Sequence, residues 1–176
     1  KSHITQTNEI LVEQGLVNQF PALVSKYPFR SFAVVCDDNT EKVAGGQIAA
    51  LLGCSKVTLP SEGLHATEKA VALAEKAMAS LPRPDCLIAA GSGTIHDITR
   101  YLAHKMDTAF ISVPTAASVD GFVSTVAAMT WHGVKKTLPA RAPVAVYADL
   151  DVIAAAPFRL TAAGFGDMVG KYTALA

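Results

Sequence analysis

The residues of this sequence with the clearest capacity for chemistry lie in one short stretch, Gly91-Ser92-Gly93-Thr94. It follows the apolar run Cys86–Ala90 and precedes a segment with helical periodicity that reaches Lys105. Glycines at a strand-to-helix turn let the backbone approach a bound group closely, and the first N–H groups and the dipole of the helix favour an anion. The turn therefore predicts a phosphate-binding site, with the Ser92 and Thr94 hydroxyls as further donors.

The spacing differs from the usual dinucleotide-binding fingerprint. Its third glycine is replaced by His96, and the turn follows about the fourth predicted strand rather than the first. Asp97 comes next, in what we expect to be the first turn of the helix. A carboxylate there either complements the helix dipole or contacts a ligand, and the sequence leaves both readings open.

Two further carboxylates, Asp37 and Asp38, follow the apolar strand predicted over Phe32–Cys36. A carboxylate at the end of such a strand can accept both hydroxyls of a ribose, and its charge disfavours a 2′-phosphate, which points to NAD more than NADP. As ordinary turn residues, the same aspartates need no ligand.

Asp120 and Asp167 are the aspartates placed best for a cleft, because each is surrounded by small residues. A carboxylate oxygen can help to bind a divalent cation, but a catalytic zinc site needs about three protein ligands. The five histidines have no HxH or HxxxH spacing, and we expect isolated histidines like these at the surface or at helix caps. Spacing alone therefore assigns no metal.

The elements that must position these residues alternate between strands and helices. Apolar runs predict strands near residues 10–12, 32–36, 56–59, 86–90, 109–113 and 144–147. We expect Asn39-Thr40 and Thr67 to cap the helices that follow them, and residues 126–138 to form a β-hairpin that turns at His132-Gly133. This alternation is typical of an α/β fold with a doubly wound, mostly parallel sheet.

Composition agrees with this class. Of 176 residues, 51% are hydrophobic but only 7% aromatic, which suits helices packed on a parallel sheet. The 15 basic and 15 acidic residues balance, so we expect neither nucleic acid nor an anionic membrane surface as a partner. Three cysteines without CxxC spacing read as buried thiols. With no apolar run of about 18 residues and no signal-peptide pattern, we expect a cytoplasmic protein without membrane insertion.

Two domains are expected. Residues 1–148 would form the α/β domain, and residues 149–176 would begin an all-helical one. The final apolar segment stops at Leu175-Ala176 without a capping residue, so we expect the helical domain to extend further than this chain. Its absence would expose an apolar face that promotes association.

Three motifs, taken in order, resemble one family. They are Gly91-Ser92-Gly93-Thr94-x-x-Asp97, Ser112-Val113-Pro114-Thr115-Ala116-Ala117-Ser118-x-Asp120-Gly121 and Gly164-Phe165-Gly166-Asp167-x-x-Gly170-Lys171. This pattern resembles the sn-glycerol-1-phosphate dehydrogenases, which belong with glycerol dehydrogenase, iron-type alcohol dehydrogenases and dehydroquinate synthase. The resemblance covers essentially the whole chain. It implies a Rossmann-like, mostly parallel sheet with helices on both faces, followed by the first helices of an α-helical domain.

The resemblance also implies roles for individual residues. Gly91, Ser92, Gly93, Thr94 and Asp97 would hold the pyrophosphate of NAD or NADP, and Asp37 would reach the adenosine ribose. The nicotinamide side would be lined by Thr115, Ala116, Ser118 and Ser124. Asp120 and Lys171 would contact the substrate, with Asp120 and Asp167 as catalytic residues. Asp167 would be the single ligand from this region to a divalent metal, either zinc or, alternatively, iron or nickel; two histidines would come from the helical domain.

The implied reaction is hydride exchange between the nicotinamide and C2 of sn-glycerol 1-phosphate or dihydroxyacetone phosphate, with the metal as Lewis acid. The substrate would be a phosphorylated polyol, the product would serve phospholipid biosynthesis, and the enzyme would be a homo-oligomer. We expect the 176-residue chain to bind nucleotide but not to turn over. Glycerol dehydrogenase, or a related polyol or alcohol dehydrogenase, is the alternative within the family. A non-catalytic nucleotide-binding module is the alternative outside it.

Overall fold

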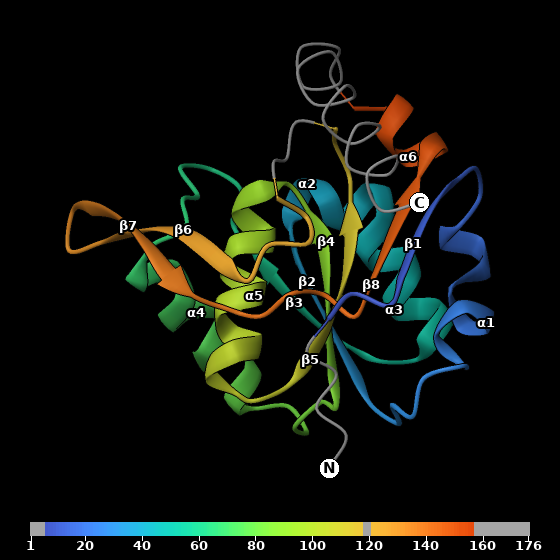
Figure 1. Cartoon of the computed structure of the whole chain (residues 1–176), viewed down its shortest axis with the longest axis horizontal. Helices are drawn as coiled ribbons and strands as arrows, with labels where there is room; N and C mark the ends of the chain where they lie inside the picture. The colour runs from blue at the N-terminus through green and yellow to red at the C-terminus, as the bar shows by residue number, and fades with distance from the viewer. Residues whose placement is uncertain (1–5, 118–120, 157–176) are drawn as a thin grey trace.

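Six parallel strands form one sheet in the computed structural model, which describes residues 6–117 and 121–156. The strands follow the order β1-β8-β5-β4-β2-β3 across the sheet (Figure 1). Their bounds are β1 (Glu9–Glu13), β2 (Phe32–Asp37), β3 (Ser55–Leu59), β4 (Cys86–Gly91), β5 (Ala109–Pro114) and β8 (Ala145–Asp149). The central strands β4 and β5 are almost wholly buried, as expected of continuous apolar runs covered on both faces. The predicted doubly wound parallel sheet is confirmed.

Helices cover both faces of the sheet (Figure 1). One face packs against the elements η1 (Val17–Gln19), α1 (Phe20–Val24), the π-helical turn η2 (Glu41–Gly45) and α3 (Gly46–Leu52). The other packs against α4 (Glu68–Ala79) and α5 (Gly93–Lys105). Two short helices, α2 (Asp38–Thr40) and α6 (Leu150–Ala154), begin directly after β2 and β8. These layers leave the carboxyl ends of the strands at one edge, with α2, α5 and α6 starting there.

The strand order reverses between β2 and β4. From β2 the chain crosses one face to β3, whereas from β4 it crosses the opposite face, by way of α5, to β5. Val35 pairs with Ala89, so Asp37 and Gly91 each lie two residues further along adjacent strands. In open α/β sheets, the crevice at such a reversal is where ligands bind. The topology thus brings the predicted ribose-binding and phosphate-binding residues together.

A hairpin of two antiparallel strands, β6 (Val126–Trp131) and β7 (Val134–Pro139), extends from the α5 side (Figure 1). Its turn places His132 and Gly133 at positive φ, as a tight hairpin turn requires. Ala127 and Met129 of β6 are buried in the core formed with α4 and α5. The predicted hairpin is therefore confirmed, and it is anchored by one side of β6.

Of the two predicted helix caps, one is confirmed and one is wrong. Thr67 caps α4, its side chain accepting a hydrogen bond from the backbone N–H of Ala70. Asn39-Thr40, by contrast, lies inside α2, and Asp37 is the capping residue. An aspartate at the end of a strand can serve as an N-cap itself, so the helix begins directly after β2, before the predicted cap.

Candidate functional site

The glycine turn joins β4 to α5 as predicted. Ser92 occupies the N-cap position of α5, and its side chain makes no capping hydrogen bond. A Cβ on Gly91 would lie 2.7 Å from the Cβ of Ile95, so only glycine lets the strand end this close to the helix. The first backbone N–H groups of a helix have no partner within it. Because no side chain caps this helix of 13 residues, as Thr67 caps α4, its start can accept an anion.

Asp37 is buried beside this turn, with 8% of its surface exposed. Its Oδ1 accepts hydrogen bonds from the backbone N–H groups of Asn39, at 2.9 Å, and Thr40, at 2.8 Å. The Thr40 hydroxyl in turn accepts from the backbone N–H of Asp37 at 3.0 Å. Ribose binding by Asp37 stays a prediction, and it would have to use the second carboxylate oxygen.

Asp38 is exposed, and its Oδ1 accepts from the backbone N–H of Ser61 at 3.3 Å. Hydrogen bonding by Ser61 lowers the pKa of the Asp38 carboxyl. The group is therefore charged at neutral pH. It places a negative charge at the carboxyl end of β2, where the sequence predicts the ribose.

Asp97 departs from its predicted place. Since α5 begins at Gly93, Asp97 is the fifth helical residue and lies beyond the first turn, so the dipole reading is wrong. Its Oδ1 lies 3.9 Å from Nε of Arg100. Burial raises the pKa of the Asp97 carboxyl, while Arg100 and the backbone of Ala128 partly oppose that rise. The contacts of Asp97 thus connect α5 to β6.

Arg100 is a residue that the sequence reading missed. It is 2% exposed, and its Nη1 donates to three backbone carbonyls, those of Gly121 (2.9 Å), Ser124 (3.3 Å) and Val126 (3.3 Å). The one available signal was an arginine among the apolar positions of α5, between Ile98 and Leu102. A buried arginine needs partners, but the sequence does not say which.

His96 is fully buried, so the expected surface or capping position is wrong for this histidine. Its Nδ1 lies 2.8 Å from the Ser92 carbonyl, and its Nε2 lies 2.7 Å from the Ser112 hydroxyl. A carbonyl only accepts, so Nδ1 carries the proton and Nε2 accepts from Ser112. Burial lowers the pKa of His96 to about 4, and the ring is neutral. His96 thereby fixes the glycine turn to β5.

The other histidines that the structure describes, His65, His104 and His132, are exposed as expected. Cys36 and Cys86 are buried free thiols, and Cys54 is partly exposed. Burial raises the pKa of all three thiols. Within residues 6–117 and 121–156, no group of three histidine, cysteine or acidic side chains could hold a metal ion.

The segment after β5 supplies the remaining predicted cofactor residues. Thr115 and Ala116 are buried, and the backbone N–H of Thr115 donates to the Gly91 carbonyl at 3.2 Å, which ties this segment to the glycine turn. Ser124 is partly exposed, and its hydroxyl donates to the carbonyl of Val126 at 3.0 Å. The predicted residues Ser118, Asp120, Asp167 and Lys171 lie outside the described residues.

Asp149 was also missed by the sequence reading. It is 2% exposed at the carboxyl end of β8, and its carboxylate accepts from the backbone N–H groups of Val17 (2.9 Å), Gly15 (3.2 Å) and Asp151 (2.9 Å). It therefore caps α6 and fixes the loop after β1. β8 runs one residue past the predicted domain boundary at 148, and that boundary stays a prediction.

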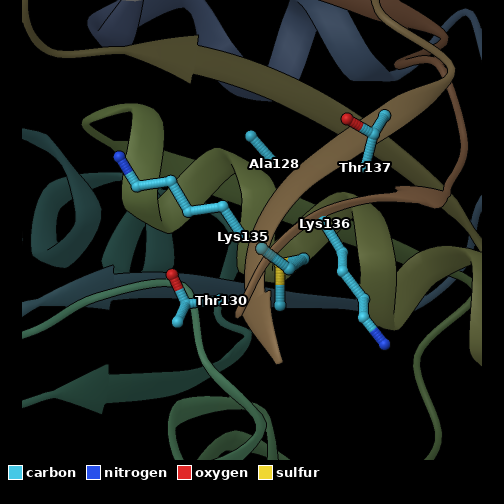
Figure 2. Close-up of a pocket in the computed structure, with 6 residues that line it drawn as sticks. Ala128, Thr130, Lys135, Lys136 and Thr137 are labelled. Carbon is cyan, nitrogen blue, oxygen red and sulfur yellow. The ribbon is translucent and has the colours of Figure 1, made fainter. Parts of the chain in front are cut away.

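Among the surface pockets of the described residues, two have a volume of about 290 Å³ each. One, beside Asp149, is lined by polar and apolar residues in similar measure, among them Asn18, Gln47 and Val43. The other lies on the hairpin and is lined by Ala128, Met129, Thr130, Lys135, Lys136 and Thr137. Figure 2 shows the two exposed lysines extending in different directions, so they do not converge on one anion. Neither pocket replaces the turn between β4 and α5 as the candidate site.

None of the described helices is long and apolar enough to cross a membrane.

Comparison with known proteins gives one family match. Residues 11–157 match the family model of iron-containing alcohol dehydrogenases. Over 99% of its length, the chain is 42% identical to a glycerol-1-phosphate dehydrogenase [NAD(P)+] from Bacillus licheniformis, of which it covers 45%. It is 34% identical to the protein of the same name from Methanosarcina barkeri, with 95% of this chain and 47% of that one covered. The chain thus spans less than half the length of these relatives.

Solved structures agree on the fold. Glycerol dehydrogenase from Schizosaccharomyces pombe superposes with a TM-score of 0.78 at 23% identity, covering 96% of this chain and 44% of that one. Maleylacetate reductase from Agrobacterium tumefaciens gives a TM-score of 0.74 at 20% identity, covering 90% and 45%. At these identities the likeness shows a shared fold and no more.

Proposed function

Because this chain belongs to the iron-containing alcohol dehydrogenase family, we propose that it is the nucleotide-binding part of an NAD(P)-dependent glycerol-1-phosphate dehydrogenase. The observation that carries the nucleotide site is the open start of α5 at the reversal of strand order. There, only Ser92 separates Gly91 from the uncapped N–H groups of a 13-residue helix. The names of the relatives support the cofactor and the substrate.

The residues fit NAD(P) in three respects. The backbone N–H groups of Gly93, Thr94 and Ile95 are free to bind the pyrophosphate, since α5 has no side-chain cap. Gly91 leaves no room for a Cβ, which keeps the helix start at the strand end. The charge of Asp38 disfavours a 2′-phosphate, so we propose NAD over NADP. When bound, NAD(P) accepts or donates the hydride.

The chain's own contribution is to bind and orient. His96 hydrogen-bonds to Ser92 and Ser112 and so holds the glycine turn against β5. Its ring is neutral, so it adds no charge to the site. The hydrogen bond from the Thr115 backbone N–H to the Gly91 carbonyl joins the carboxyl ends of β5 and β4. We place Ser118 and Ser124 at the nicotinamide, as the resemblance implies. Water is excluded beneath the site by the buried strand ends.

The substrate and metal assignments rest on the family alone. Asp120 and Lys171 at the substrate and Asp167 at a divalent metal belong to this proposal, as do a homo-oligomeric state and a cytoplasmic location. The described residues include no group of three potential metal ligands. We further propose that the groups completing such a site correspond to the half of the relatives that this chain does not match.

Titration with NADH tests the nucleotide site directly. Trp131 is the single tryptophan, and it lies on β6, 5.4 Å from the Tyr101 ring on α5. We expect NADH to quench its emission and Gly93→Val to weaken binding by about tenfold or more, because the valine side chain blocks the approach to the helix start. Ala77→Val adds the same side chain at an exposed site on α4 and should bind as wild type does. Equal NADH affinity for Gly93→Val and wild type would refute the assignment.

A further inference from the structure

The segment of residues 121–126, between the β5 loop and β6, is held by one side chain from α5. Nη1 of Arg100 donates to the carbonyls of Gly121, Ser124 and Val126. Within the segment, the backbone N–H of Ser124 donates to the Gly121 carbonyl at 2.9 Å, and Gly121 adopts a φ of 75°. The Arg100 guanidinium therefore binds three carbonyls of this segment, which point toward α5.

This arrangement is costly for stability alone. Arg100 is 2% exposed, its Nε has no hydrogen-bond partner among the described residues, and Asp97 stands off at 3.9 Å. Buried charges with incomplete partners are often less stable than an apolar side chain of similar size. A methionine would fill the volume but would remove the donor to the Ser124 carbonyl and one of the two hydrogen bonds to each of the Gly121 and Val126 carbonyls. The hydrogen bonds of the guanidinium are directional, so they fix the distance of segment 121–126 from α5. An apolar contact would not fix this distance.

The segment is also placed to matter for the cofactor. Asp97 and Arg100 lie one helical turn apart on the helix whose start is the proposed pyrophosphate site, and Ser124 is our candidate for the nicotinamide side. We propose that Arg100, oriented by Asp97, is a positioning residue that holds segment 121–126 against α5 and so places the nicotinamide end of the cofactor. This inference rests on the proposed function.

The far end of the hairpin is anchored independently. The backbone N–H of Thr130 donates to the Ala66 carbonyl at 2.7 Å, and that of His132 donates to Glu68 Oε1 at 3.1 Å. Ala127 and Met129 remain in the core. Loss of Arg100 should therefore release residues 121–126 while leaving the rest of β6 in place.

The test compares two probes by calorimetry on the 176-residue chain. NADH reports both halves of the site, and ADP-ribose lacks the nicotinamide. We expect Arg100→Met to weaken NADH binding by about tenfold, while ADP-ribose affinity stays within about twofold of wild type. Arg100→Lys, which keeps the charge but not the planar guanidinium, and Asp97→Asn should give smaller losses of the same selective kind. Arg141→Met is the matched control, because Arg141 pairs with Asp107 at the surface.

Hydrogen exchange in the unliganded variants gives a second readout. The amides of Ser124 and Val126 should exchange faster in Arg100→Met, and the amide of Thr130 should not. An equal loss of NADH and ADP-ribose affinity in a folded Arg100→Met would overturn the inference, as would no loss of either. Should Arg100→Met fail to fold, Arg100→Lys and Asp97→Asn decide by the same comparison. Wild-type protein that binds neither probe would instead overturn the proposed nucleotide site, and this inference with it.

Discussion

Replacing Gly91 by alanine tests whether the close approach of β4 and α5 is what builds the site. The new Cβ would lie 2.7, 2.8 and 2.9 Å from the Cβ, Cγ1 and Cγ2 atoms of Ile95. Relief to an ordinary contact of about 3.6 Å requires the start of α5 to move by about 1 Å. Overpacking of this kind costs about 1–3 kcal/mol. Alanine also lowers the conformational entropy of the unfolded chain relative to glycine, which stabilises the folded state by about 0.4–1 kcal/mol. We therefore expect a net loss of about 1–2 kcal/mol in the free energy of unfolding.

The same movement should weaken nucleotide binding. Backbone N–H groups hold an oxygen over a range of about 2.7–3.2 Å, so a shift of about 1 Å breaks these bonds. We expect NADH affinity to fall by about tenfold. Urea unfolding followed by Trp131 emission gives the stability, and the midpoint should fall with the slope unchanged. The NADH titration gives the affinity.

Gly53→Ala is the matched control for this experiment. Gly53 ends α3 at a φ of 60°, and a Cβ there meets nothing within 4 Å. Alanine is strained by its backbone conformation, so this variant should lose stability by about 1 kcal/mol but bind NADH as wild type does. The reasoning is refuted if Gly91→Ala keeps wild-type stability within about 0.5 kcal/mol and wild-type NADH affinity.

Two further predictions concern charge. The pKa of His96 falls from its ordinary 6.5 to about 4 on folding, so its contribution to stability is complete above pH 6.5 and is lost as the pH falls toward 4. This amounts to roughly 3 kcal/mol. Urea unfolding at pH 7 and pH 4.5 should show a steeper loss in wild type than in His96→Gln, and equal losses would contradict the assignment. Asp38→Asn should improve the affinity for NADPH relative to NADH by about threefold at low salt, because it removes an exposed charge. Calorimetry with both nucleotides measures that ratio, and an unchanged ratio would place the 2′-phosphate away from Asp38.

The features that were predictable from sequence have local causes. Cys86–Gly91 is a continuous apolar run, Thr67 is an N-cap residue before an amphipathic helix, and His132-Gly133 is a turn between two short strands. Each is decided by neighbours a few residues away. The position of Asp97 was misjudged because α5 already begins at Gly93, which makes Asp97 its fifth residue and puts it beyond the first turn.

The features that sequence reasoning missed depend on partners far along the chain. Asp149 accepts from backbone groups 132 and 134 residues earlier, and the three carbonyls bound by Arg100 lie 21 to 26 residues later. His96 was misjudged for the same reason, because Ser112, its partner on β5, becomes adjacent only when the sheet forms. A polar residue at an apolar helical position signals a buried partner, but only the fold identifies it.

The position of these residues on α5 explains why one helix combines so many constraints. Ser92 makes no capping hydrogen bond, which leaves the start of α5 open for the anion of the proposed site, and the stability that a cap would add has to come from elsewhere on the helix. His96 supplies a contact to β5, and Arg100 supplies three to segment 121–126. These contacts lie within two turns of the open end, where they oppose fraying most directly. An added side-chain cap at residue 92, as in Ser92→Asp, would stabilise α5 and compete with the pyrophosphate, so stability and NADH affinity should move in opposite directions.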